Sequence, residues 1–328
     1  MTNATHRSYG IDLARTIAVL GVVMVHSGCF NNGRFGVQLF FLISGYLLAD
    51  LGNHSNRDFL VRRGFRLFPL YFCILFLFYL NNHTSLWQLL VSLFLLQSMH
   101  WNFSLVSGVW SISNEWLFSL LLPLIKNISK KQILILIGIS WLGQLFTSYL
   151  VYKWGGVRTT DSDNQYELKT WLNTLNPGIN LAFFLIGVGM KKKLLPTLKN
   201  KLIAFLIVVL GQLITYVTGN SLLFMWPPIL WAIFSMCLHW SPQSRILKST
   251  IAFIGQRTYG IFFVHFIFLG HIQNLNLVRQ LSDNYGFRNW VVFFLTMSIS
   301  VLLSEVTWKF IERPFIKTST RYMKRKIE

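Results

Sequence analysis

Three ionisable residues lie in the first long apolar segment of the chain, DLARTIAVLGVVMVH (12–26): Asp12, Arg15 and His26. In a helix, eleven residues make three turns plus about 20°, so Arg15 and His26 share one face, about 16 Å apart along the axis. Asp12 lies three residues before Arg15 and can pair with it. An imidazole exchanges protons near neutral pH and a guanidinium holds anions. This face could therefore do chemistry, and an interfacial arginine with a core histidine is the structural alternative.

A group of cations lies in the segment FLVRRGFRLFPLY (59–71), where Arg62, Arg63 and Arg66 precede Pro69. If this segment is helical, Arg63 and Arg66 are neighbours one turn apart. Two guanidinium groups could then converge on one multiply charged anion, and their planar forks suit phosphate oxygens. An ordinary cytoplasmic anchor of positive charge is the alternative interpretation.

A carboxylate interrupts the apolar segment GVWSISNEWLFSLLLP (108–123). Ser111 and Glu115 are four residues apart and share a helical face, with Trp110 beside them. A glutamate inside an apolar segment needs a partner, and the cations of the two segments above are available. Glu115 is therefore a candidate functional residue, with a purely structural salt bridge as the alternative.

Two further segments carry weaker signals. In RTYGIFFVHFIF (257–268), Tyr259 and His265 lie within an apolar pattern, and each alone is typical of a structural residue. In the segment 36–48, the pair Ser44-Gly45 predicts close helix packing of the small-residue type.

The composition indicates that membrane helices position these residues. The 328 residues are 53% hydrophobic and only 12% charged, about half the charged fraction of a soluble protein. The net charge of +19 comes from 30 Lys and Arg that lie between apolar runs, as the positive-inside rule expects, so no nucleic-acid partner is predicted. The three cysteines form no CxxC pair, and the pattern predicts neither a disulfide framework nor a metal site.

Apolar runs of membrane-spanning length predict an all-α, polytopic helical bundle. The predicted spans are 9–28, 34–51, 109–125, 132–152, 172–190, 201–218, 222–240, 250–271 and 288–310. The first has no A-x-A-like cleavage site and is expected to remain as a span. The stretch 67–99 holds two shorter apolar runs separated by NNHTS.

The loops predict which ends of the helices are cytoplasmic. Basic loops occur at 57–66, 126–131, 191–201 and 244–248 and in the C-terminal tail, whereas the loop 152–169 balances acids and bases. If all the basic loops are cytoplasmic, 67–99 makes one net crossing, as a full span plus a re-entrant or interfacial piece. This predicts about ten crossings with both termini cytoplasmic, in a single membrane-embedded domain over 1–328 without an appended soluble domain. Two ordinary short spans in 67–99 remain the alternative.

The ordered set of motifs resembles the acyltransferase 3 family, which comprises integral membrane enzymes that O-acylate carbohydrates. It includes Arg15-x10-His26, FFLISGY, Arg63-x-x-Arg66 before Pro69, and Trp110-Ser111-x-x-x-Glu115. Thr258-Tyr259-Gly260-Ile261-Phe262-Phe263-Val264-His265 is similar to another motif of that family, and Glu312-x-Pro314 to its last. Thr258 and Phe262 stand where that motif has Ser and Tyr, and Ser119 stands where an aromatic residue often follows Phe118.

The resemblance implies a membrane O-acyltransferase of a bacterial cytoplasmic (inner) membrane. Acyl-CoA, most commonly acetyl-CoA, would be a co-substrate rather than a bound cofactor. The acceptor would be a carbohydrate such as a surface polysaccharide, an O-antigen or its lipid-linked precursor, and membrane lipid would surround the protein.

The chemistry of acyl transfer suggests roles for the candidate residues. His26 would be the base that takes the hydroxyl proton, or a transient acyl carrier, and Glu115 would orient it. Arg62, Arg63 and Arg66 would hold the phosphates of acyl-CoA. Arg15 would extend that positive surface or polarise the thioester carbonyl.

Two other classes of function remain open. In a transporter or flippase for a lipid-linked sugar, buried charges would line a pathway, but no repeat halves or paired broken helices are visible. A membrane scaffold would not need the buried ionisable groups. Within the enzyme class, the acceptor could instead be a lipid, a peptide or a small metabolite.

Overall fold

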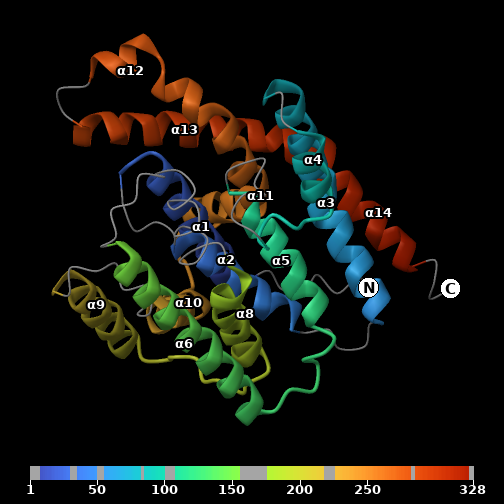
Figure 1. Cartoon of the computed structure of the whole chain (residues 1–328), viewed down its shortest axis with the longest axis vertical. Coiled ribbons are helices and arrows are strands. Elements are labelled where there is room, and N and C mark those ends of the chain that lie inside the picture. The colour runs from blue at the N-terminus through green and yellow to red at the C-terminus, as the bar shows by residue number, and fades with distance from the viewer. Residues whose placement is uncertain are drawn as a thin grey trace. The chain divides into compact units, whose positions relative to one another are not determined.

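The computed structural model describes residues 8–29, 35–49, 55–82, 85–99, 108–155, 176–217, 226–281 and 285–324 (Figure 1). Within these ranges the regular secondary structure is helical. The chain divides into two compact units. Unit 1 comprises Met1–Ile43 and Pro196–Glu305, and unit 2 comprises Ser44–Leu195 and Val306–Glu328. The prediction that 1–328 is a single domain stays a prediction.

Unit 1 is built around the contact between α1 and α11. Its helices are α1 (Tyr9–His26), the first part of α2 (Phe35–Leu48), α9 (Lys201–Val217), α10 (Trp226–Leu238), α11 (Arg245–Gln273), α12 (Asn276–Gln280) and most of α13 (Tyr285–Thr307). Figure 1 shows α1 in dark blue beside α11 in orange. Val19 and Val23 of α1 form an apolar cluster with Ile261 and Phe293.

Glycines allow the helices of unit 1 to approach closely. A Cβ atom at Gly255 of α11 would lie 2.7 Å from the Cβ atom of Asp12. A Cβ atom at Gly10 of α1 would overlap the carbonyl oxygen of Cys237 in α10. Because the side chain of glycine is a single hydrogen atom, α1 can lie this close to α10 and α11.

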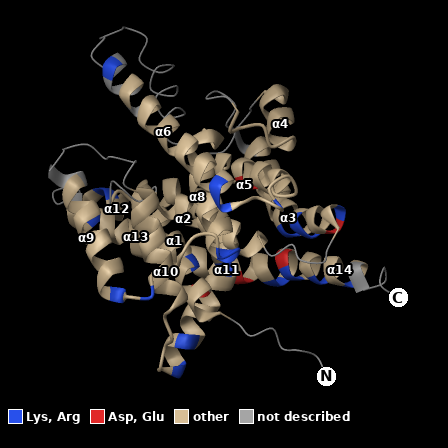
Figure 2. Cartoon of the chain, turned by 90° about the horizontal axis from the view of Figure 1, so that it is seen from below, with Lys and Arg blue, Asp and Glu red and all other residues tan. Residues whose placement is uncertain are grey.

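Unit 2 contains the arginine-bearing helix and the carboxylate-bearing helix. Its helices are the end of α2, α3 (Asn56–Asn82), α4 (Leu86–Leu93), α5 (Trp110–Leu121), α6 (Lys130–Gly155), α8 (Pro177–Lys191), the π-helix η3 (Trp308–Glu312) and α14 (Arg313–Lys324). α6 packs against α8, and α14 packs against α3. Figure 2 shows that α3 and α14 carry many of this unit's Lys and Arg residues, whereas α8 is mostly tan.

Gly45 confirms the predicted close helix contact in the segment 36–48. A Cβ atom at Gly45 would overlap the carbonyl oxygen of Phe184 in α8. The end of α2 therefore packs on the backbone of α8, as small residues allow in membrane helices.

Four helices are long and apolar enough to cross a membrane: Tyr9–His26, Asn56–Leu80, Arg245–Gln273 and Gly286–Tyr322. Four shorter apolar helices are Phe35–Leu48, Pro177–Lys191, Lys201–Ile214 and Trp226–Leu238. The described helices agree with a helical membrane protein, and large apolar side chains such as Phe76, Ile139 and Leu302 are exposed on them. The count of about ten crossings and the cytoplasmic termini stay predictions.

The ambiguous stretch 67–99 contains one long helix and one short one. α3 already begins at Asn56 and carries the arginines and Pro69 within it. α4 has eight residues and spans about 12 Å, too short for a hydrocarbon core of about 30 Å. This agrees with the expectation of a full span plus a short piece. Residues 156–169 of the mixed-charge loop lie outside the described residues.

Candidate active site

His26 at the end of α1 forms a hydrogen bond with His265 of α11. Nδ1 of His26 lies 2.9 Å from Nε2 of His265, and the two rings are nearly parallel, with an interplanar angle of 9°. His265 is fully buried, whereas His26 is partly exposed. The pair lies within unit 1 and depends on the packing of α1 on α11.

The second nitrogen of His265 fixes the proton positions in this pair. Nδ1 of His265 lies 3.3 Å from the carbonyl oxygen of Ile261, one turn earlier in α11. A carbonyl oxygen only accepts, so Nδ1 of His265 carries the hydrogen and its Nε2 has the lone pair. Nδ1 of His26 must then be the donor to His265. In the neutral pair, this leaves the lone pair of His26 on Nε2, where a base can use it.

Aromatic side chains cover the histidine pair. The ring of Phe266 lies 4.8 Å from that of His26 and 3.9 Å from that of His265, centroid to centroid. Phe262 meets His265 edge to face at 5.8 Å. These apolar walls keep water from competing for the hydrogen bond between the two imidazoles.

The other end of α1 carries the predicted ion pair. The guanidinium of Arg15 lies 3.8 Å from the carboxylate of Asp12, as the spacing of three residues predicts. Asp12 is buried, and Arg15 is partly exposed. In the same unit, the guanidinium of Arg257 pairs with the carboxylate of Glu305. Unit 1 thus holds the ion pair of Asp12 and Arg15 near the start of α1 and the imidazole of His26 at its end.

Glu115 has its partners within unit 2. Its Oε1 accepts hydrogen bonds from the hydroxyl of Ser44 and from the guanidinium of Arg63. Arg63 is buried on α3, Arg62 is partly exposed and Arg66 is exposed. Of the cations considered from the sequence, the arginine cluster supplies the partner of this carboxylate.

The remaining candidates have local contacts. The hydroxyl of Ser111 donates to the carbonyl oxygen of Gly108 at 2.9 Å, and Trp110 is buried beside it. Tyr259 meets Phe263 edge to face, with 5.0 Å between the ring centroids. Among the described residues, no group of three or more His, Cys, Asp and Glu could hold a metal ion.

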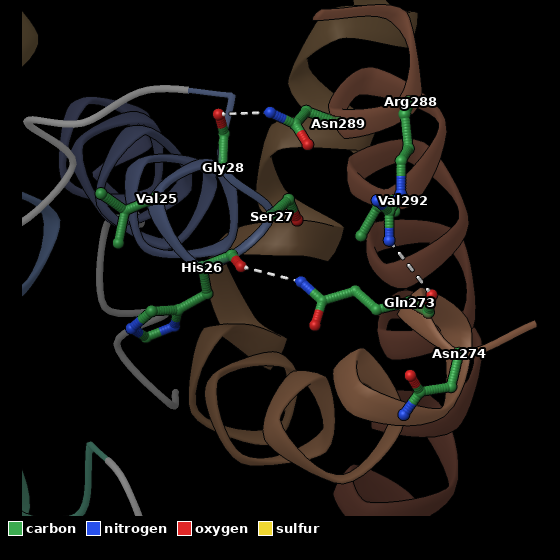
Figure 3. Close-up of a pocket in the computed structure, with 9 residues that line it drawn as sticks. All are labelled: Val25, His26, Ser27, Gly28, Gln273, Asn274, Arg288, Asn289 and Val292. Atoms are coloured by element: carbon green, nitrogen blue, oxygen red, sulfur yellow. Dashed lines mark hydrogen bonds between the residues drawn. The ribbon is translucent and has the colours of Figure 1, made fainter. Parts of the chain in front are cut away.

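A pocket of about 400 Å³ lies next to His26 in unit 1. Its polar wall is formed by Gln273 and Asn274 at the end of α11 and by Arg288 and Asn289 at the start of α13 (Figure 3). The carbonyl oxygen of His26 faces Gln273, while its ring points away from these four side chains. His26 therefore lines the pocket, and its imidazole is not part of the polar wall.

Residues 8–309 match the family described as an acyltransferase domain, Acyl_transf_3. The chain belongs to the acyltransferase 3 family.

Curated relatives of the chain include proteins of two bacteria. The chain is 24% identical over 361 residues to "Putative O-acetyltransferase SACOL0978" of Staphylococcus aureus (strain COL), and 23% identical over 366 residues to "O-acetyltransferase OatA" of strain NCTC 8325 / PS 47. Each alignment covers 94% of this chain and 57% of the relative. The chain is also 34% identical to "Putative peptidoglycan O-acetyltransferase YrhL" of Bacillus subtilis (strain 168), over 34% of this chain and 18% of that protein.

The chain thus spans little more than half the length of the Staphylococcus relatives that it matches. No solved structure matches it significantly.

For this member of the acyltransferase 3 family, the structure adds two partners that sequence reasoning had not assigned. His265, a weak candidate from the sequence alone, is the hydrogen-bond partner of His26. Ser44, which the sequence predicts as a packing residue, also donates to Glu115. The similarity of the residues around His265 to a family motif is the sequence signal that points to His265 as a functional residue. Glu115 and His26 belong to different units, so the orienting role of Glu115 stays a prediction.

Proposed function

We propose that this protein transfers an acyl group, most simply acetyl, from acyl-CoA to a hydroxyl group of a carbohydrate acceptor. The observation that carries the proposal is the hydrogen-bonded chain from Ile261 through His265 to His26, which leaves a lone pair on Nε2 of His26. A partly exposed imidazole with a fixed tautomer suits a general base. Family membership and the names of the relatives support acyl transfer.

The reaction moves one proton from the acceptor hydroxyl to His26 and then from His26 to the leaving thiolate of CoA. Nε2 of His26 takes the proton of the acceptor hydroxyl as its oxygen attacks the thioester carbon. The resulting imidazolium donates through Nδ1 to His265, whose lone pair stabilises it. The tetrahedral intermediate then breaks its C–S bond, and the imidazolium returns the proton to the leaving thiolate of CoA. The products are the ester and free CoA, and His26 is neutral again.

The arginine residues would bind the donor. Arg63 is held by Glu115, so we assign it to positioning α3. The partly exposed Arg62 and the exposed Arg66 would contact the phosphates of acyl-CoA. Arg15 lies about 16 Å along α1 from His26, too far to touch a carbonyl that is under attack beside His26. We therefore assign Arg15 to the positive surface that attracts the nucleotide.

The acceptor would be a polysaccharide of a bacterial cell surface or its lipid-linked precursor. The relatives named for O-acetylation, one of them of peptidoglycan, support this class. The apolar helices place the enzyme in a membrane, and we propose the cytoplasmic membrane. With the N-terminus of α1 on the cytoplasmic side, the pantetheine arm would carry the thioester along α1, from the end that bears Arg15 towards His26.

Purified protein in lipid nanodiscs, given radiolabelled acetyl-CoA and fragments of bacterial surface polysaccharide, tests this proposal. We expect label in the carbohydrate with the wild-type protein and none above background with His26→Ala. The matched control is His271→Ala, because His271 is an exposed histidine on α11. Acceptor labelling that persists in His26→Ala would overturn the assignment of His26.

A further inference from the structure

The pocket beside His26 has a mixed set of hydrogen-bonding groups. The amide nitrogen of Asn289 donates to the carbonyl oxygen of Gly28 at 2.8 Å. The amide nitrogen of Gln273 approaches the carbonyl oxygen of His26 at 3.5 Å. Both amide groups are thereby turned so that their nitrogens face α1. Within the described part of the chain, the amide oxygens of Asn289 and Gln273 accept no protein hydrogen bond, and they remain for a ligand.

The pocket also contains hydrogen-bond donors. The side-chain oxygen of Asn274 accepts from Arg279 at 2.8 Å, which leaves its amide nitrogen as a donor. Arg288 contributes a guanidinium, with one nitrogen 3.5 Å from the carbonyl oxygen of Gln273. Figure 3 shows the side chain of Arg288 extending to the backbone carbonyl oxygen of Gln273, whose own side chain points to His26. The wall thus combines amide acceptors with amide and guanidinium donors.

This combination fits a neutral ligand that is rich in hydroxyl groups. A hydroxyl both donates and accepts, so it uses the two kinds of group together. An anion without hydrogen-bond donors could not use the two amide oxygens, and Arg288 would repel a cation. Val25 and Val292 also line the pocket, and they offer apolar contact to the C–H face of a sugar ring. A volume of about 400 Å³ is within the usual range for small-molecule sites.

An unpaired hydroxyl lies in the same wall. The Oγ of Ser27 is buried and has no hydrogen-bond partner in the described structure, although Ser27 lines the pocket between His26 and Gly28. A buried hydroxyl without a partner costs free energy. A ligand, or water ordered by one, would relieve this cost.

We propose that this pocket binds a neutral sugar unit of the acceptor, next to the unit whose hydroxyl group reaches His26. This inference rests on the proposed function and deepens it, because it assigns a subsite of the acceptor. The ring of His26 points away from the polar wall, so the sugar in the pocket is a neighbour of the reacting unit. An acceptor of several sugar units would then bind more tightly than a single sugar.

The test uses the full chain in nanodiscs and β-1,4-linked N-acetylglucosamine oligomers of one to four units as probes. The variant Gln273→Leu/Asn274→Ala removes one acceptor and one donor from the pocket. The control is Asn276→Ala, an exposed asparagine on α12 that does not line the pocket. Two lost hydrogen bonds should raise the KM for the tetramer roughly 10- to 30-fold. The KM values for the monomer and for acetyl-CoA should not change.

Saturation-transfer NMR of the tetramer on the same proteins separates this inference from the proposed function. Binding of the tetramer by wild-type protein that is lost in the double variant supports the pocket, even if no acetyl group is transferred. Wild-type protein that binds no oligomer overturns the inference. An equal rise in KM for monomer and tetramer also overturns it, because the site would then be the reacting subsite itself.

Discussion

Nδ1 of His26 lies 2.9 Å from Nε2 of His265, although 239 positions separate the two residues in the chain. This contact joins the end of α1 to the C-terminal half of α11. It gives the candidate base a partner that sets its tautomer and can stabilise its positive charge.

Replacement of His265 should therefore reduce kcat strongly and change KM much less. A leucine at position 265 cannot accept the hydrogen bond from His26, and we expect kcat to fall by about 100-fold or more, in the range of positioned proton transfer. A glutamine can place its side-chain oxygen near the former Nε2 and should recover part of the loss. Steady-state kinetics with varied acceptor check both variants. Equal kcat values for His265→Leu and His265→Gln would show a packing role only.

The ion pair between Arg63 and Glu115 should contribute strongly to stability. Arg63→Ala leaves a mostly buried carboxylate without its cation, which costs about 3–5 kcal/mol in comparable buried pairs. Thermal unfolding in detergent should show a clear decrease in Tm. The control is Arg66→Ala, since Arg66 is exposed on the same helix.

A double variant separates the ion pair from simple packing. In Arg63→Leu/Glu115→Gln, no unpaired charge remains, and much of the lost stability should return. If Arg63→Ala unfolds at the same temperature as the control, the pair contributes little to the fold.

Arg66 should affect the KM for the acyl-CoA donor and not the KM for the acceptor. We expect Arg66→Ala to raise the KM for acetyl-CoA several-fold, with the acceptor KM unchanged, because a phosphate contact is lost. Acetyl-dephospho-CoA lacks one phosphate group, so its KM should respond less to the substitution if Arg66 contacts that group. The same comparison with Arg321→Ala, an exposed arginine on α14, controls for a general loss of positive charge. A rise that is equal for Arg66→Ala and Arg321→Ala contradicts a specific contact.

Alanine substitutions at two glycines of α11 should have opposite effects on the stability of the protein. At Gly270 a Cβ atom meets nothing within 4 Å, and alanine should stabilise the helix by up to about 1 kcal/mol. At Gly255 the Cβ atom would lie 2.7 Å from Cβ of Asp12, and overpacking of this kind costs about 1–3 kcal/mol. Gly255→Ala should therefore lower Tm and also kcat, because α1 and α11 together hold the histidine pair. Thermal unfolding and kinetics measured on both variants check the difference in sign.

The helical and apolar character of the chain, and its family, follow from the sequence alone. Hydropathy and the spacing of charges predicted the apolar helices, and the period of the helix predicted the pair of Asp12 and Arg15. The order of the motifs predicted the family. These features depend on neighbours within one or two turns, or on composition, and both can be read directly from the chain.

The tertiary structure decided which partner each buried ionisable group obtains. From the sequence, Glu115 could have paired with any of several cations, but helix packing within unit 2 places Arg63 against it. His265 became the partner of His26 because Gly255 lets α11 lie close to α1. Residues distant in the chain meet through the contact surfaces of whole helices, which depend on small residues and side-chain shape. Helical periodicity carries no information about those contacts.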